Sequence, residues 1–372
     1  LRANILPGFI FVTGSTGTGK SQPLSEPVLT PDGWQIMSDL KPNDYVIGSD
    51  GFPTRVLGVF PQGKQDVYTI TTFDGAKIRC SPDHLWAVDV PNHSLLKRVV
   101  KTTLEMVDSF RPYKYYLPTF AGIQKGITID YAYALGYALG NGGFSGTALT
   151  ISFHADVEEK VLKLLAPTLG STYHIRSTSK NGRQAAYPWY KIHPEIAKYR
   201  NAGLSEHKSL ILGDLNYSLW DYDSRLSLLQ GLLDADGCLQ VDGNSQHCSF
   251  SSTSIELVAL VKDLTRSLGG RCGNATIDNR SKRYKSSYSA TLRILMPVNP
   301  FKLKADLWRL AKYRPTSSIK TITKENYLEE SVCIQVEAKD SLYVTKDYKL
   351  THNTVLIKLL VTTTHCLNRP AG

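Results

Sequence analysis

The chain has 372 residues, enough for two or three domains, and its 42% hydrophobic content is ordinary for a globular protein. No run approaches the ~20 consecutive apolar residues that span a membrane, and residues 1–20 lack the pattern of a signal peptide. The six cysteines contain no Cys-x-x-Cys pair, which argues against a zinc ribbon or a disulfide framework. We therefore expect a cytoplasmic protein that has no membrane partner.

The formal net charge is +10, and most of the excess lies between residues 120 and 314. A basic segment of this kind favours a polyanionic partner. A solvated basic surface without a specific partner is the alternative, and charge alone does not separate the two.

Residues 14–20 read Gly-Ser-Thr-Gly-Thr-Gly-Lys and follow an apolar run, as in a phosphate-binding loop. Such a loop opens into a helix, but Pro23 and Pro27 interrupt the segment that follows. The apolar, proline-free run that begins at Thr354 would supply the missing helix if it were joined directly to Lys20. The pattern predicts that residues 21–353 interrupt the loop of an ATPase. In the rejoined loop the expected nucleotide-binding residues are Gly14, Gly19, Lys20 and Thr354.

The residues at both ends of this interruption carry nucleophilic side chains. Ser21 begins it, and His352 and Asn353 end it immediately before Thr354. These junctions resemble those of an intein, a segment that excises itself and ligates its flanks. The resemblance implies that Ser21 and Thr354 are the nucleophiles, that Asn353 cyclises with help from His352, and that no cofactor is needed. The resemblance also implies that the host flanks, residues 1–20 and 354–372, take part in the reaction in cis, as segments of the same chain.

Residues 21–118 alternate short apolar runs with turn signals such as Asp-Gly, which predicts an all-β region. Within it, Cys-Ser-Pro-Asp-His at 80–84 is similar to the Thr-x-x-His block of inteins, with Ser81 in place of threonine. The resemblance implies that His84 assists the first step, because imidazole exchanges protons near neutral pH. A turn histidine with a purely structural hydrogen bond is the alternative.

Residues 119–314 contain two similar halves of helices and strands. We expect Asp130 to cap the leading helix of the first half, and Asp223 or Ser224 to cap that of the second. These helices contain the runs 134–142 and 229–237, which resemble the motif that names the LAGLIDADG homing endonucleases.

Small residues four positions apart on these helices predict close contact between their backbones. The pairs are Gly136 with Gly140 and Gly231 with Ala235.

This contact would bring Asn141 and Asp236 together at one end of the helix pair. The resemblance implies that both are catalytic and bind Mg²⁺. Asn141 stands where the family has aspartate, so we expect weaker metal binding and impaired cleavage. The implied partner is double-stranded DNA. The expected basic contacts to it are Lys191, Arg280, Lys282, Arg283, Lys285 and Arg293.

Residues 315–353 are again β, and Asp340 lies where the intein family places an acid. It could also be an ordinary turn residue. The sequence thus predicts a mixed fold. A discontinuous all-β splicing domain of the HINT type occupies 21–118 and 315–353, with an inserted, pseudo-symmetric α+β endonuclease domain in 119–314. Mg²⁺ is expected for the endonuclease, and ATP with its Mg²⁺ is expected for the spliced host only. The alternative function is a P-loop ATPase with a permanent insertion.

Overall fold

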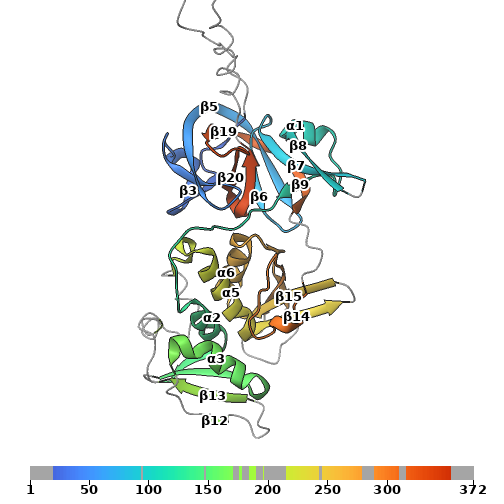
Figure 1. The fold of residues 1–372 in the computed structure, drawn as a ribbon. Coiled ribbons are helices and arrows are strands. Elements are labelled where there is room, and N and C mark those ends of the chain that lie inside the picture. The colour runs from blue at the N-terminus through green and yellow to red at the C-terminus, as the bar shows by residue number, and fades with distance from the viewer. Residues whose placement is uncertain are drawn as a thin grey trace, which may run out of the picture.

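The structure is a computed structural model. It describes residues 20–93, 95–145, 148–170, 176–177, 184–189, 196, 215–242, 245–278, 289–309 and 316–352. Figure 1 shows a β-rich body built from the first and last of these segments, and below it a body of helices and strands built from the middle of the chain. No helix among the described residues is both long and apolar enough to cross a membrane.

The β-rich body is organised around two long strands, β5 (Pro53–Thr72) and β19 (Thr316–Val336), which pair antiparallel across several register shifts. They lie in an eight-stranded sheet of order β4-β5-β19-β9-β7-β8, with β1 paired to β19 and β6 to β5. The other strands of this sheet are β1 (Gln22–Pro23), β4 (Tyr45–Ile47), β6 (Lys77–Cys80), β7 (Leu85–Asn92), β8 (Leu95–Thr102) and β9 (Tyr116–Pro118). Helix α1 (Thr103–Asp108) follows β8 and begins with a capping box.

A second sheet of order β21-β20-β2-β3 joins the two ends of the described chain. It combines β2 (Pro27–Thr30) and β3 (Gly33–Ile36) with β20 (Leu342–Thr345) and β21 (Lys349–His352). Because β2 pairs directly with β20, residues more than three hundred positions apart become neighbours. This pairing brings the two ends of residues 21–352 to the same part of the molecule.

The lower body contains two similar units, each a helix followed by strands and a second helix. The first comprises α2 (Ala132–Asn141), β10 (Gly142–Ser145), β11 (Ala148–His154), α3 (Glu158–Leu169), β12 (Arg176–Ser177) and β13 (Gln184–Trp189). The second comprises α5 (Tyr222–Asp236), β14 (Gly237–Asp242), β15 (Ser245–Ser252), α6 (Ile255–Ser267), β16 (Arg271–Cys272), β17 (Thr276–Asp278) and β18 (Ser289–Leu295). The sheet orders β10-β11-β13-β12 and β14-β15-β18-β16 correspond, and the second sheet has β17 in addition, paired with β18. The predicted mixed fold class is confirmed.

Helices α2 and α5 pack against each other backbone to backbone. A Cβ atom on Gly136 would lie 2.2 Å from the carbonyl oxygen of Leu228, and one on Gly231 would lie 2.3 Å from that of Tyr133. Only glycine permits approach at these distances, so the predicted contact through small residues is confirmed. It places the two helix C-termini side by side.

The predicted helix caps were wrong. Helix α2 has Tyr131, and not Asp130, at its N-cap position, and the Tyr131 side chain makes no capping hydrogen bond. Helix α5 is capped by Asp221, whose carboxylate accepts from the Ser224 backbone N–H at 2.9 Å. Each of these Asp and Ser residues has a side chain that can cap a helix, so the sequence offers several candidates. The packing of the chain decides which of them stands at the helix N-terminus.

Candidate functional site

The first candidate site is a set of residues, here called the junction cluster, that three separate segments bring together. Ser21 precedes β1, Ser81 and His84 lie in the turn between β6 and β7, and Thr351 and His352 end β21. The Ser21 backbone N–H donates to Ser81 Oγ at 3.0 Å, and the Ser81 backbone N–H donates to the Ser21 carbonyl at 2.9 Å. The hydroxyl predicted at position 81 therefore contacts the nitrogen of the peptide bond between Lys20 and Ser21.

His84 is buried at the centre of this cluster and forms a hydrogen bond with the Thr351 hydroxyl. Its ring packs edge-on against Trp86, with the ring centroids 4.9 Å apart. Burial, reinforced by the nearby His352, lowers the pKa of His84 to about 3, while a hydrogen bond with the Ser21 main chain acts in the opposite direction. His84 is consequently neutral near pH 7.

Ser21 itself is only 1% exposed. Within the described part of the chain, its buried Oγ has no hydrogen-bond partner. A buried hydroxyl left in this state costs about 1–3 kcal/mol, which is a cost typical of functional sites. The hydroxyl oxygen is therefore not engaged elsewhere and is available as a nucleophile.

The side chain next to the nucleophile links both ends of the described chain. Gln22 accepts a hydrogen bond from the Tyr343 hydroxyl at 3.0 Å and donates to the Arg79 carbonyl at 3.3 Å. Gln22 and Tyr343, like Thr351, were not singled out from the sequence. Polar character beside a junction could have pointed to Gln22 and Thr351, but Tyr343 lies on β20, away from both junctions.

The structure places Asp340 in the turn before β20, where its side chain is exposed. Its carboxylate accepts from the Ser49 hydroxyl and from the Leu342 backbone N–H, the latter at 3.1 Å. Because Leu342 pairs with His352, this turn lies at the end of the hairpin that carries His352. These two hydrogen bonds stabilise the turn, and neither of them connects Asp340 to His84.

Several predicted residues lie outside the described residues. They are Asn353 and Thr354 at the downstream junction, Gly14 and Gly19 of the phosphate-binding loop, and the basic residues Lys191, Arg280, Lys282, Arg283 and Lys285. Lys20 is described and lies half-buried directly before Ser21.

The second candidate site lies where α2 and α5 end. The Asn141 amide Nδ2 donates to the Ala235 carbonyl at 3.2 Å, and Asp236 is exposed beside it. Asn141 contacts Ala235, which precedes Asp236, and a Cβ on Gly140 would lie 3.3 Å from Asp236 Oδ2, so the two predicted residues lie at the same end of the helix pair.

This pair is a poor fit to a divalent cation. One carboxylate and one amide that already donates to the opposite helix offer less negative charge than two carboxylates. Among the described residues, there is no group of three or more His, Cys, Asp and Glu side chains arranged to hold a metal ion.

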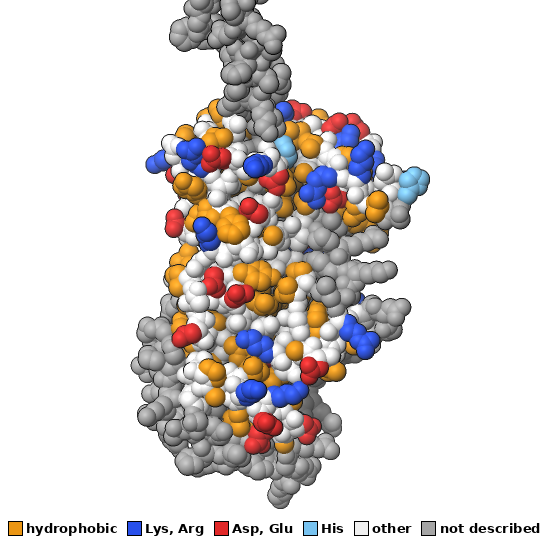
Figure 2. Space-filling model, in the orientation of Figure 1, with side chains coloured by type: hydrophobic (Ala, Val, Ile, Leu, Met, Phe, Trp, Pro, Cys, Tyr) orange, Lys and Arg blue, Asp and Glu red, His pale blue; other side chains and the backbone are white. Residues whose placement is uncertain are grey.

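Arg293 is the one predicted basic contact that the structure describes. It lies on the exposed face of β18, where Ser249 is its partner in the neighbouring strand, and its guanidinium Nη2 is 3.2 Å from His247 Nδ1. Figure 2 shows basic and acidic side chains interspersed over the face in view, with no continuous basic band.

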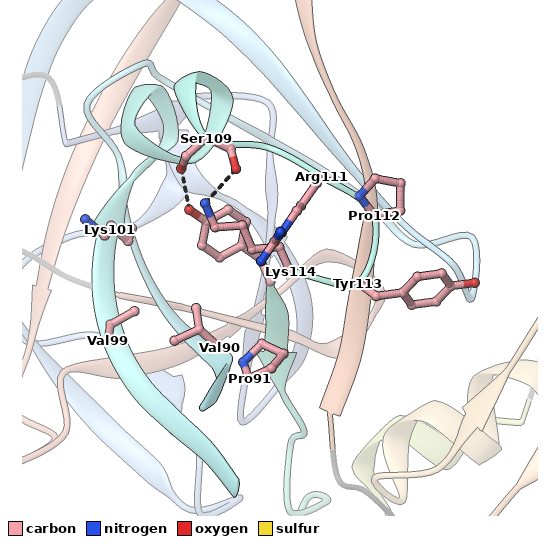
Figure 3. A pocket seen from close by; sticks show the side chains of 10 residues that line it. Val90, Pro91, Val99, Lys101, Ser109, Arg111, Pro112, Tyr113 and Lys114 are labelled. Carbon is pink, nitrogen blue, oxygen red and sulfur yellow. Dashed lines mark hydrogen bonds between the residues drawn. The ribbon is translucent and has the colours of Figure 1, made fainter. Parts of the chain in front are cut away.

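A pocket of about 660 Å³ lies between β7, β8 and residues 109–115 (Figure 3). Its wall carries Lys101, Arg111 and Lys114. Lys114 Nζ donates to the Ser109 carbonyl at 2.6 Å, and Lys101 pairs with Glu105 at 3.3 Å. No residue of the junction cluster lines this pocket. It takes no part in the chemistry described above.

Residues 223–295 match the family described as LAGLIDADG-like domain. They include most of α5 and the sheet that follows it, while the junction cluster lies in the separate β-rich body. The chain contains a LAGLIDADG-like domain over residues 223–295. The replicative DNA helicase DnaB of Mycobacterium intracellulare is 26% identical over 307 residues, which is 79% of this chain and 50% of that protein. The chain therefore spans about half the length of this curated relative.

Solved structures with detectable similarity include both inteins and a homing endonuclease. A variant of the gp41-1 intein covers 90% of this chain and 100% of its own, at 12% identity and a TM-score of 0.29. The Msm DnaB1 intein splicing domain bound with zinc covers 24% of this chain and 64% of its own, at 27% identity and a TM-score of 0.20. I-DmoI in complex with DNA and Ca covers 47% of this chain and 94% of its own, at 17% identity and a TM-score of 0.32.

Proposed function

We propose that the chain excises residues 21–353 and ligates Lys20 to Thr354. The observation that carries this proposal is the buried junction cluster, in which Ser21, Ser81 and His84 meet the strand that ends at His352. We further propose that residues 21–118 and 315–353 form the splicing domain, and that 1–20 and 354–372 are the flanks supplied by the host.

The first step is an acyl shift at the upstream junction. Ser21 Oγ attacks the Lys20 carbonyl carbon, the carbon–nitrogen bond breaks, and an ester forms while the Ser21 nitrogen takes up the hydroxyl proton. Neutral His84 accepts the hydroxyl proton and passes it to that nitrogen, which Ser81 Oγ holds in place at 3.0 Å. Burial excludes water that would hydrolyse the ester.

The later steps transfer and release the acyl group. Thr354 Oγ attacks the ester carbonyl and frees Ser21 Oγ. The Asn353 side-chain nitrogen then attacks its own carbonyl carbon, forms a succinimide and breaks the bond to Thr354. His352 stabilises the developing charge. The freed Thr354 nitrogen attacks the ester and restores a peptide bond from Lys20 to Thr354. Holding all groups in one chain replaces a bimolecular encounter.

Mass spectrometry of the purified chain tests this sequence of steps. We expect a product of residues 21–353 and a ligated product of 1–20 with 354–372. Replacing Asn353→Ala should stop release of the downstream flank while leaving ester formation at Ser21 intact. Unchanged release of that flank by Asn353→Ala would refute the assignment.

We also propose that the LAGLIDADG domain binds a double-stranded DNA site and cuts it poorly. Binding is supported by the duplicated units and by the polar face of β18 that carries Arg293. The proposed target is the uninterrupted host gene across the insertion point. Because phosphate contacts release counterions, affinity should fall steeply as salt rises.

Mg²⁺ at Asn141 and Asp236 would supply the charge that stabilises a phosphodiester leaving group. We propose that it binds weakly here, because Asn141 contributes no charge and its amide donates to Ala235. The test compares this chain with an Asn141→Asp variant on the proposed target DNA in Mg²⁺. Equal cleavage by both chains would refute the proposal that Asn141 impairs cleavage. Absence of specific DNA binding by either chain would refute the DNA-binding proposal.

The alternative function, a P-loop ATPase with a permanent insertion, predicts that the unspliced chain binds nucleotide. Titration calorimetry with ATP and Mg²⁺ distinguishes the two functions. Tight binding by the unspliced chain would favour the ATPase. Binding that arises only after ligation of Lys20 to Thr354 would favour splicing.

A further inference from the structure

The turn between β20 and β21 has a backbone that its own sequence does not favour. It forms a short 3-10 segment, η6 (Lys346–Tyr348), in which Asp347 and Tyr348 have φ values of 58° and 57°. Two consecutive non-glycine residues in the left-handed region persist only where surrounding contacts hold them. The β-rich body supplies the Lys77 backbone N–H, which donates to Asp347 Oδ2 at 3.1 Å, and the Trp34 ring, whose centroid lies 5.0 Å from that of Tyr348. The LAGLIDADG domain supplies the side-chain contacts described next.

Helix α6 supplies two side chains to this turn. Arg266 donates to the Asp347 carboxylate through Nη1, and the Tyr348 hydroxyl donates to Asp263 Oδ2 at 3.0 Å. Asp263 and Arg266 are three residues apart, so they lie on one face of the helix. In Figure 1, α6 lies at the edge of the lower body nearest to the β-rich body.

The same arginine also reaches a buried ion pair at the start of β21. Lys349 Nζ lies 2.7 Å from Asp74 Oδ2, and Arg266 Nη2 donates to the Asp74 carbonyl at 2.9 Å. All three residues are buried. A charged group removed from such an arrangement leaves its partner buried and unpaired, which disturbs the structure around it.

These contacts, here called the interdomain clamp, fix the strand that carries the downstream junction. The clamp comprises Asp74, Asp263, Arg266, Asp347, Tyr348 and Lys349. Lys349 begins β21 and His352 ends it, with Thr351 contacting His84 between them. Because side chains alternate along a strand, a shift of one residue at Lys349 would turn Thr351 away from His84.

We propose that Arg266 of the LAGLIDADG domain is a positioning residue for release of the downstream flank. It acts by holding the turn and the start of β21, and thereby the placement of His352. This inference rests on the proposed splicing function. It makes the inserted domain part of the scaffold of the splicing site, although none of its side chains touches the reacting atoms.

The experiment separates the two junctions in two backgrounds of the full chain. In Ser21→Ala, only cleavage at Asn353 occurs, and its rate is followed by gel and mass spectrometry. In a chain that carries both Asn353→Ala and Thr354→Ala, only the ester at Ser21 forms, and hydroxylamine cleavage measures it. Arg266→Met is introduced into each background. Lys160→Met, which removes an exposed cation of the same domain paired with Asp306 at 3.5 Å, is the matched control.

We expect Arg266→Met to slow downstream release by roughly 10- to 100-fold, because a misplacement of about 1 Å costs this much in a preorganised site. Hydroxylamine cleavage should fall by a smaller factor, through the Thr351–His84 contact, because Arg266 holds the strand that carries Thr351 and does not contact His84. Tyr348→Phe removes one hydroxyl from the clamp and should slow downstream release by a smaller factor, with an unchanged circular dichroism spectrum.

Equal losses at both junctions, or no loss at either, would overturn the clamp's role. If Arg266→Met does not fold, Tyr348→Phe decides, since an unaltered downstream rate in that variant also overturns it. Absence of both reactions in chains that keep Arg266 would instead refute splicing itself, together with the clamp.

Discussion

The contact between α2 and α5 is most sharply tested by Gly231→Ala. The added methyl would lie 2.3 Å from the Tyr133 carbonyl oxygen and 2.7 Å from the Tyr137 nitrogen. Carbon and carbonyl oxygen normally approach no closer than about 3.3 Å, so the helices must separate by roughly 1 Å. Both obstructing atoms belong to backbone, which cannot rotate away as a side chain can.

The magnitude follows from two opposing effects. Overpacking of this kind costs about 1–3 kcal/mol, and two backbone obstacles place Gly231→Ala near the upper end of that range. The higher helix propensity of alanine returns up to about 1 kcal/mol. A net loss of about 2 kcal/mol lowers the unfolding temperature of a domain of this size by roughly 4–8 °C.

Differential scanning calorimetry measures the shift in a chain that also carries Ser21→Ala and Asn353→Ala, so that no peptide bond breaks. Gly273→Ala is the matched control, because a Cβ at Gly273 meets nothing within 4 Å. An equal unfolding temperature for the Gly231 and Gly273 variants would show that the helices do not approach through these glycines.

Three further predictions concern buried polar groups of the β-rich body. Because the pKa of His84 is lowered to about 3, its neutral form stabilises the fold above its unfolded pKa of about 6.5, and this stability is lost as pH falls toward 3. Urea titrations should show that His84→Gln removes this dependence, and an unchanged slope would contradict it. Burial alone would raise the pKa of Asp74, but the Lys349 ammonium lowers it overall, so its contribution is lost only as pH falls below about 4. Asp74→Asn should abolish that acid transition, and persistence of the transition would exclude Asp74 as its source. Thr351→Val removes the hydroxyl that holds His84 and should slow hydroxylamine cleavage at least about tenfold; a rate like that of the parent would make this contact dispensable.

The parts of the fold that local chemistry determines were predictable from the sequence. Asp-Gly turns marked the strands, and the turn at Gly75 is observed with φ of 78°. The repeated helix motifs predicted which glycines meet, since their four-residue spacing defines one helix face. The residues that make up each signal lie within a few positions of one another, so the local structure that they specify does not depend on long-range contacts.

The partners of the junction residues could not be predicted in this way. Gln22 and Tyr343 are separated by 321 positions, and His84 and Thr351 by 267. Nothing near either member of a pair specifies the other, because the pairing depends on how β2 meets β20. Helix caps failed for a related reason: several polar residues compete at each boundary, and packing selects among them.

The place of the insertion explains how a large domain can interrupt a sheet without breaking it. Pro118 at the end of β9 pairs with Thr316 at the start of β19, so the two strands that flank the insertion are antiparallel neighbours. A short turn could join neighbouring antiparallel strands as well as an inserted domain does. Backbone pairing in the eight-stranded sheet therefore does not depend on what lies between residues 118 and 316. The clamp does depend on this segment, because the contact of Arg266 with Asp347 joins it to the turn before the strand that ends at His352. Strand pairing alone tolerates loss of the insertion, while placement of the downstream junction depends on keeping it.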